Sequence, residues 1–181
     1  MEMNKTRYKK SLPMIPFSYQ EAVNTGLNKY LLKKMMDEGI IEKLERNLYQ
    51  RTDRDEDLEE SQYRIAMIRC GLPSSLCLLT ALSYYHVTDE IPRQTWVLVP
   101  ESKRVSSKEL KLVRSRNPQW DIGIRKSKEY WITTLERTLI DGIIYKRLIG
   151  SQVALGAIKE ALSQKKIKLG DLYDMAKKMG V

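Results

Sequence analysis

The chain has 181 residues, of which 42% are hydrophobic and 30% charged, as is typical of one large or two small folded domains. Two cysteines, Cys70 and Cys77, exclude a disulfide framework, and a single histidine, His86, excludes a histidine-rich metal site. No apolar run approaches the ~20 residues of a membrane helix, and the start is polar and basic, unlike a secretory signal. We therefore expect a cytoplasmic protein with no membrane partner.

The net charge of +9 is unevenly distributed along the chain. Residues 1–52 carry +4, residues 53–60 carry −5, and residues 61–181 carry +10. We interpret the acidic run as a linker, with domains at 1–52 and 61–181. Alternatively, these acids begin a helix, whose N-terminal end attracts negative charge. The basic blocks either face nucleic-acid phosphates or are an ordinary solvated surface.

The first block contains signals for two short helices. The capping-box pattern at 18–21, with Ser18 as N-cap, predicts a helix that ends before Gly26. Asn28 is a suitable N-cap for a second helix at 29–38, which Gly39 would end. An apolar side of this helix is formed by Leu27, Leu31, Leu32, Met35 and Met36.

A short hairpin is predicted directly after the second helix. Residues 40–45 and 48–51 resemble strands, and Asn47 between them tolerates the left-handed conformation of a tight turn. A helix followed by a basic hairpin indicates a winged helix-turn-helix, whose helix suits a major groove about 12 Å wide. The alternative is a dimerisation module with a solvated basic face. The expected DNA-binding residues are Asn28, Lys29, Tyr30, Lys33 and Lys34 on the helix, and Lys43 and Arg46 on the hairpin.

The second block is predicted to be a mixed α/β domain, which makes the whole chain α+β. Strands are expected at 95–100, 110–114, 122–125 and 130–132. Helices are expected at 58–69, at 76–86 with Ser75 as N-cap, at 135–148 with Thr134 as N-cap, after Gly150-Ser151, and at 171–178. The inner stripe expected for the helix at 135–148 is Leu135, Leu139, Ile140, Ile143, Ile144 and Leu148.

Two polar groups of this block are candidate functional features. Glu136, Arg137 and Asp141 are interpreted as a structural cluster that fixes a helix start to the sheet, with a catalytic carboxylate pair as the alternative. Residues 103–128 carry nine basic and two acidic side chains and form a possible second basic patch. Its basic residues are Lys103, Arg104, Lys108, Lys111, Arg114, Arg116, Arg125, Lys126 and Lys128.

Several segments resemble the AbiEi family, the antitoxin and transcriptional-regulator component of type IV toxin–antitoxin and abortive-infection systems. Residues 26–49 are similar to the family's helix-turn-helix, with Asn47 in place of its wing glycine. The likeness continues through 76–86 and 96–100. It also includes 133–141, which is similar to the family's T-x-x-E-R-T-L-x-D box. In total it covers most of residues 17–150.

The resemblance implies a DNA-binding autorepressor that recognises inverted repeats in double-stranded DNA at its own promoter. It also implies antagonism of a nucleotidyltransferase toxin, with direct contact not required. The strip at 103–128 would then either extend the contact with DNA or take part in the antagonism of the toxin. A stand-alone regulator without a toxin partner is an alternative.

An enzyme, such as a DNA-targeted nuclease, is a further alternative. Its acids would come from Glu109, Asp121 and Glu129, but these residues show no metal-ligand spacing. Neither a phosphate-binding glycine loop nor a serine nucleophile elbow occurs in the sequence. We therefore expect no catalytic residue, metal or cofactor.

Overall fold

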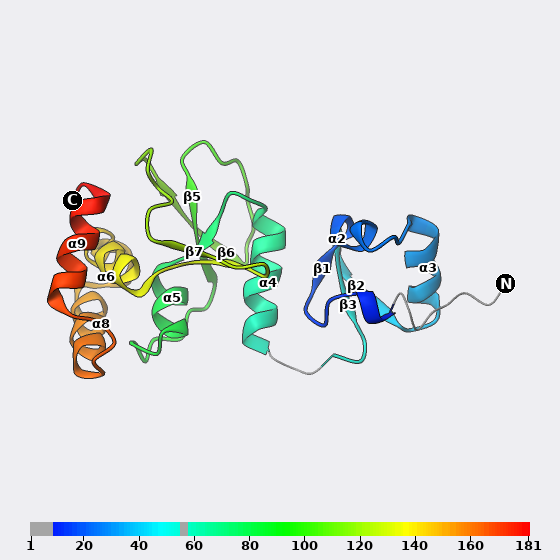
Figure 1. Ribbon diagram of the computed structural model, residues 1–181, viewed down its shortest axis with the longest axis horizontal. Helices are drawn as coiled ribbons and strands as arrows, with labels where there is room; N and C mark the ends of the chain where they lie inside the picture. The colour runs from blue at the N-terminus through cyan, green and yellow to red at the C-terminus, as the bar shows by residue number, and fades with distance from the viewer. Residues whose placement is uncertain (1–8, 55–57) are drawn as a thin grey trace. The chain divides into compact units, whose positions relative to one another are not determined.

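The computed structural model describes residues 9–54 and 58–181, and the chain divides into two compact units. Unit 1 is Met1–Arg69 and unit 2 is Cys70–Val181. Helices and strands occur in both units, and the strands form two separate sheets (Figure 1). The predicted α+β class is thus confirmed at this level. No helix within the described ranges has the length and apolar character needed to cross a membrane.

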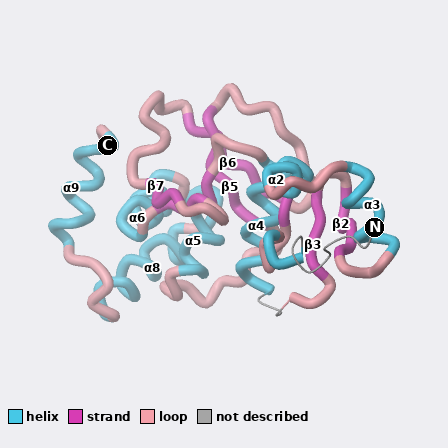
Figure 2. The backbone as a smooth tube through the Cα atoms, turned by 45° about the vertical axis from the view of Figure 1, so that its right-hand side comes forward, coloured by secondary structure: helices cyan, strands magenta, loops and turns pink. Residues whose placement is uncertain are grey.

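Unit 1 is built on a small antiparallel sheet with the strand order β1-β3-β2. Its strands are β1 (Phe17–Ser18), β2 (Ile41–Glu45) and β3 (Leu48–Arg51), and its helices include α2 (Tyr19–Asn24), α3 (Lys29–Asp37) and α4 (Leu58–Cys70). α2 follows β1 without a connecting residue, and α3 leads into the β2–β3 hairpin beside it (Figure 2).

The local signals in the sequence explain where these elements begin and end. The Ser18 hydroxyl accepts a hydrogen bond from the Glu21 N–H at 3.3 Å, and the Glu21 carboxylate accepts one from the Ser18 N–H at 2.8 Å. Asn28 Oδ1 accepts from the Leu31 N–H at 2.9 Å and caps α3. The hairpin turns at Asn47, whose φ of +64° lies in the left-handed region. The predicted helices and hairpin are therefore confirmed.

The apolar side predicted for α3 faces the core of unit 1. Leu27, Leu32 and Met35 are buried, and Leu31 and Met36 pack against them partly buried. The same core contains Leu12, Phe17, Ala22 and Ile41. Burying this side fixes the rotation of α3 and leaves its basic side outward.

α4 includes the end of the acidic run that we interpreted as a linker. Residues 55–57 of that run lie outside the described residues, while Leu58 begins the helix. Arg64 pairs with Glu21 and donates to the Pro16 carbonyl, and Arg69 Nε donates to Glu45 Oε1 at 2.6 Å. These bonds attach α4 to the rest of unit 1, which as a compact unit extends to Arg69.

Unit 2 contains a mixed five-stranded sheet with the order β6-β5-β4-β8-β7. The pairs β5/β6 and β4/β8 are parallel, and β4/β5 and β7/β8 are antiparallel. The strands are β4 (Ser75–Leu76), β5 (Thr95–Pro100), β6 (Leu110–Ser115), β7 (Ile124–Lys126) and β8 (Trp131–Thr133). The helices are α5 (Leu78–Tyr84), α6 (Leu135–Ile144), α7 (Lys146–Ile149), α8 (Ser151–Ser163) and α9 (Leu169–Met179).

The core of unit 2 lies between the sheet and its helices. Trp96, Leu98 and Val113 from the sheet join Leu82 of α5 and Leu139 of α6 in one buried cluster. α8 contributes the buried Ala154, Ala157 and Ala161. Figures 1 and 2 show α6, α8 and α9 gathered on one side of this unit, and α6 contacts both of the others.

Two details of the predicted helices are wrong. Ser75 does not cap a helix, because Ser75 and Leu76 form β4, and Cys77 precedes the first residue of α5. The helix expected at 135–148 stops at Ile144, and the chain turns at Tyr145 into α7. Ile143, Ile144 and Leu148 are exposed by 37%, 45% and 51%, and do not continue the inner stripe.

Candidate nucleic-acid interface

The outward side of α3 presents most of the helix residues that we expected to contact DNA. Lys29, Tyr30 and Lys33 are exposed, and Lys34 is half-buried. Tyr30 is exposed by 71% and has no role in the core. The Oδ1 of Asn28 is occupied as the helix cap, so its amide NH₂ is the part left to contact a ligand.

The basic side chains of unit 1 that the structure describes fall into two groups. In the first, each cation has a partner: Lys9 and Arg51 bind Asp53, Arg54 donates to Ser61, Arg64 binds Glu21, and Arg69 binds Glu45. Arg51 and Lys9 hold the pKa of Asp53 well below its usual range. The second group has no such partner among the described residues and consists of Lys10, Lys29, Lys33, Lys34, Lys43 and Arg46.

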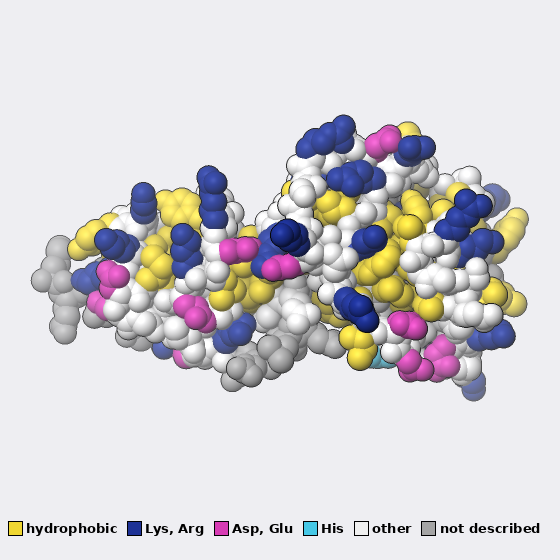
Figure 3. Space-filling view, turned by 180° about the vertical axis from the view of Figure 1, so that it is seen from behind, with side chains coloured by type: hydrophobic (Ala, Val, Ile, Leu, Met, Phe, Trp, Pro, Cys, Tyr) yellow, Lys and Arg dark blue, Asp and Glu magenta, His cyan; other side chains and the backbone are white. Residues whose placement is uncertain are grey.

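The β2–β3 hairpin adds two cations of this second group. Lys43 and Arg46 are exposed, while the neighbouring acids are engaged, Glu42 by Gln50 and Glu45 by Arg69. Asn47 Oδ1 accepts a hydrogen bond from the Tyr19 N–H at 3.1 Å, which ties the hairpin turn to the start of α2. Figure 3 shows Lys and Arg side chains projecting from the surface of this unit.

The strip at 103–128 is not one continuous patch in the structure. β6 carries Lys111 and Arg114, and β7 carries Arg125 and Lys126. These strands are the two opposite edges of the sheet, with three strands between them. At about 4.8 Å per strand spacing, the two halves of the strip are roughly 19 Å apart. The sequence could not show this separation, because it arises from the order of the strands.

Several cations of the strip are held by neighbouring groups. Arg125 lies over the Tyr84 ring and donates to its hydroxyl at 2.6 Å. Lys126 lies 4.6 Å from the Trp131 ring centroid and 3.5 Å from Asp121. Lys103 Nζ donates to the carbonyls of Gly71 and Leu72 at 3.0 and 2.8 Å. Lys111 lies over Trp96, whereas Lys108 and Lys128 are exposed.

The polar group at the start of α6 is only partly brought together. Arg137 and Asp141 are both buried, and Arg137 Nε donates to Asp141 Oδ2 at 2.9 Å. Arg137 also donates to the carbonyls of Trp120 and Ile122, which connects α6 to the loop before β7. Burial raises the pKa of Asp141 to about 6, against the lowering effect of Arg137. Glu136 is half-buried, and its side chain forms no hydrogen bond or ion pair with Arg137 or Asp141.

Gly123 is a residue of this cluster that the sequence analysis did not identify. Its φ is +71°, and a Cβ at this position would lie 2.8 Å from the Arg137 Cβ. Glycine therefore allows the loop to approach α6 closely enough for its carbonyls to reach the guanidinium group. A single glycine between two isoleucines carries no sequence signal for such a contact.

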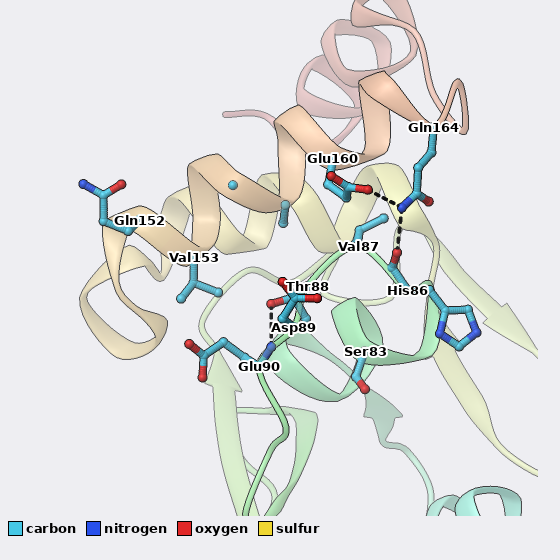
Figure 4. Close-up of a pocket in the computed structure, with 12 residues that line it drawn as sticks. Ser83, His86, Val87, Thr88, Asp89, Glu90, Gln152, Val153, Glu160 and Gln164 are labelled. Carbon is cyan, nitrogen blue, oxygen red and sulfur yellow. Dashed lines mark hydrogen bonds between the residues drawn. The ribbon is translucent and has the colours of Figure 1, made fainter.

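His86 lies at a hollow of about 660 Å³ in unit 2, between residues 83–90 and α8. The His86 carbonyl accepts a hydrogen bond from Gln164 Nε2 at 3.1 Å, and Figure 4 shows the imidazole turned away from Asp89 and Glu90. No group of three or more His, Cys, Asp or Glu side chains suited to a metal ion occurs within the described ranges. Among the described residues around this hollow, the His86 imidazole has no hydrogen bond to a serine or cysteine side chain that could act as a nucleophile.

Comparison with protein-family models and with curated proteins finds no match to this chain.

Proposed function

We propose that the protein is a DNA-binding transcriptional regulator that contacts the duplex through α3 and the β2–β3 hairpin. The observation that carries the proposal is the division of the unit 1 cations. The cations that stabilise the fold are paired, whereas those on one helix face and one hairpin are exposed or, at Lys34, half-buried, and have no partner among the described residues. Unpaired Lys and Arg bind phosphates favourably because they release condensed counterions.

The order of elements in unit 1 supports a winged helix-turn-helix. Two short helices are joined by a turn that contains Gly26, at φ +90°, and the second helix is followed by a hairpin whose strand β3 also pairs with β1. α3 has nine residues, a length of about 14 Å, which suits insertion into a major groove about 12 Å wide. On this proposal α3 enters the groove and the hairpin binds the adjacent backbone.

We further propose that the DNA is the protein's own promoter and that the protein counteracts a nucleotidyltransferase toxin. This part rests on the resemblance of residues 26–49 and 133–141 to the AbiEi family. Co-expression with the product of the neighbouring reading frame tests it, and rescue of growth is the expected result. Promoter binding without rescue would indicate a stand-alone regulator.

The central test is the substitution of Lys33 and Lys34 by alanine. Removing two phosphate-binding charges should weaken promoter binding by about tenfold or more, because charge-assisted hydrogen bonds to phosphate are lost. A gel-shift titration on the DNA upstream of the gene measures this, and circular dichroism verifies folding.

The matched control replaces Lys177 and Lys178, an adjacent exposed pair on α9, with alanine. This variant should bind promoter DNA as the unchanged protein does. Equal affinity of the folded Lys33/Lys34 variant and the control would eliminate α3 as the DNA-contacting helix. A loss of self-association in the former, measured by sedimentation, would favour a dimerisation module.

A further inference from the structure

Unit 2 contains a hollow of about 760 Å³ whose rim carries three arginines of the 103–128 strip. We call it the arginine hollow and define it by Arg104, Arg114, Arg116, Glu101, Pro118 and Trp120. It is formed where two parallel strands end side by side, since Pro100 at the end of β5 pairs with Ser115 at the end of β6. Loops that follow the carboxyl ends of parallel strands are a common place for ligand binding in α/β sheets.

The loops that line the arginine hollow are held by backbone and side-chain hydrogen bonds. Glu101 N–H donates to the Ser115 carbonyl at 3.0 Å and connects the two loops. Asn117 donates to the Met179 carbonyl at 3.2 Å and accepts from the Gln119 N–H at 2.9 Å. The carbonyl of Trp120 accepts from the buried Arg137. The position of the loop is thus set before any ligand binds.

The guanidinium groups at the rim are held only weakly. Arg104 and Arg114 donate to backbone carbonyls of Glu101 and Val105, at 2.9 and 3.4 Å. Arg116 pairs with the Glu101 carboxylate at 3.0 Å, but these side chains are exposed by 88% and 59%. Exposed pairs of this kind contribute little, whereas arginine binds phosphate oxygens with two parallel hydrogen bonds. A phosphate group can therefore replace these contacts with stronger ones.

The rest of the lining supplies apolar surface. Trp120 is partly buried and packs against the core, and Pro118 and Pro100 lie beside it in the lining. A ligand with phosphates and a planar ring would use both kinds of surface, since aromatic side chains stack on bases. The volume falls within the range of about 300 to 1,000 Å³ that is usual for small-molecule sites.

We propose that the arginine hollow binds a mononucleotide, with its phosphates on Arg104, Arg114 and Arg116 and its base against Trp120. A hollow of this size at strand ends favours a small ligand over a duplex. The proposal concerns unit 2 and does not depend on DNA binding by α3.

Isothermal titration of the full chain with ATP tests the proposal. Arg114→Ala should weaken ATP binding by about tenfold, and Arg104→Ala with Arg116→Ala by at least as much. The control is Arg147→Ala on α7, an exposed arginine outside the hollow, which should leave the affinity unchanged. The Lys33/Lys34 variant should also bind ATP normally, which separates this result from that of the promoter experiment.

A second arm replaces ATP with inorganic tripolyphosphate. Weaker binding of tripolyphosphate is expected, because it has no ring to contact Trp120. This comparison needs no substitution at Trp120, where a change would disturb the core. Absence of ATP binding at millimolar concentration, or equal binding by the Arg114 variant, would overturn the proposal. Tighter binding of a single-stranded oligonucleotide than of ATP, lost with the same arginines, would also overturn it in favour of a nucleic-acid surface.

Discussion

Arg137 and Asp141 are a buried ion pair, and its contribution to stability depends on the hydrogen bonds that Arg137 also makes to the backbone. The guanidinium group donates to the Trp120 and Ile122 carbonyls as well as to Asp141, and Arg137 is only 4% exposed. Gly123 makes this approach possible, because any side chain there would meet Arg137. The cluster fixes the loop before β7 to α6, which favours the structural interpretation over a catalytic one.

The stability of the protein should depend on pH through Asp141. Its pKa of about 6 in the folded chain lies above the ordinary 3.8, so the folded state holds this proton more tightly than the unfolded state. The resulting stabilisation is complete below about pH 4 and is lost as the pH rises through about 6. A shift of about two pKa units corresponds to on the order of 3 kcal/mol.

Asp141→Asn isolates this contribution because asparagine does not titrate. The unfolding free energy of the unchanged protein minus that of the variant should fall by on the order of 3 kcal/mol between pH 4 and pH 7. Urea unfolding at several pH values measures the difference, and Asp174→Asn, at an exposed position, is the control. A difference that is constant or grows with pH would contradict the buried-carboxyl explanation.

At the scale of elements, the hairpin depends on Asn47 in two ways. Its backbone occupies φ +64°, and its side chain accepts the hydrogen bond from the Tyr19 N–H. Glycine keeps the first property and loses the second, whereas valine loses both. The two replacements therefore separate backbone strain from the side-chain bond.

Asn47→Gly should reduce the unfolding free energy by about 1 kcal/mol or less. The loss of one hydrogen bond costs about 1 kcal/mol, and glycine offsets part of it because it adopts positive φ without strain. Asn47→Val should cost about 2 kcal/mol or more, because a β-branched residue is strained in the left-handed region. Denaturant unfolding gives both values. Equal stability of the two variants would mean that the turn places no demand on the residue at position 47.

The elements that the sequence predicted well are those with local signals. The capping box at Ser18, the cap at Asn28 and the turn at Asn47 depend on residues within a few positions of one another. Ser75 was misassigned because its partners in the sheet, such as Leu98, are distant in sequence. The arginine hollow could not be predicted from the sequence either, because its two loops are brought together by the pairing of Pro100 with Ser115 in the sheet.

At the scale of the whole molecule, the net charge of +9 is divided between cations that stabilise the fold and cations that face outward. On the proposed surface of unit 1, five cations have no partner among the described residues: Lys29, Lys33, Lys34, Lys43 and Arg46. A protein that uses such groups on phosphates gains affinity from the release of counterions. Under the proposed function, the salt dependence of binding reports how many of these cations contact the duplex.

Promoter affinity should fall steeply with salt. If all five cations contact phosphates, the slope of log affinity against log salt is about −4 to −5, at about −0.9 per contact. The Lys33/Lys34 variant should give a slope shallower by about 2. Gel shifts or fluorescence anisotropy across a range of salt concentrations provide both slopes. A flat response in the unchanged protein would point to a protein partner instead of DNA.

Ser18 is at once the last residue of β1 and the N-cap of α2, so no spacer separates the strand from the helix. β1 in turn pairs with β3 through Phe17 and Ser18. The hairpin and α2 are therefore joined through β1, with no connecting residue between the strand and the helix. An inserted residue between positions 18 and 19 would uncouple them, so this junction should tolerate no change of length among functional variants.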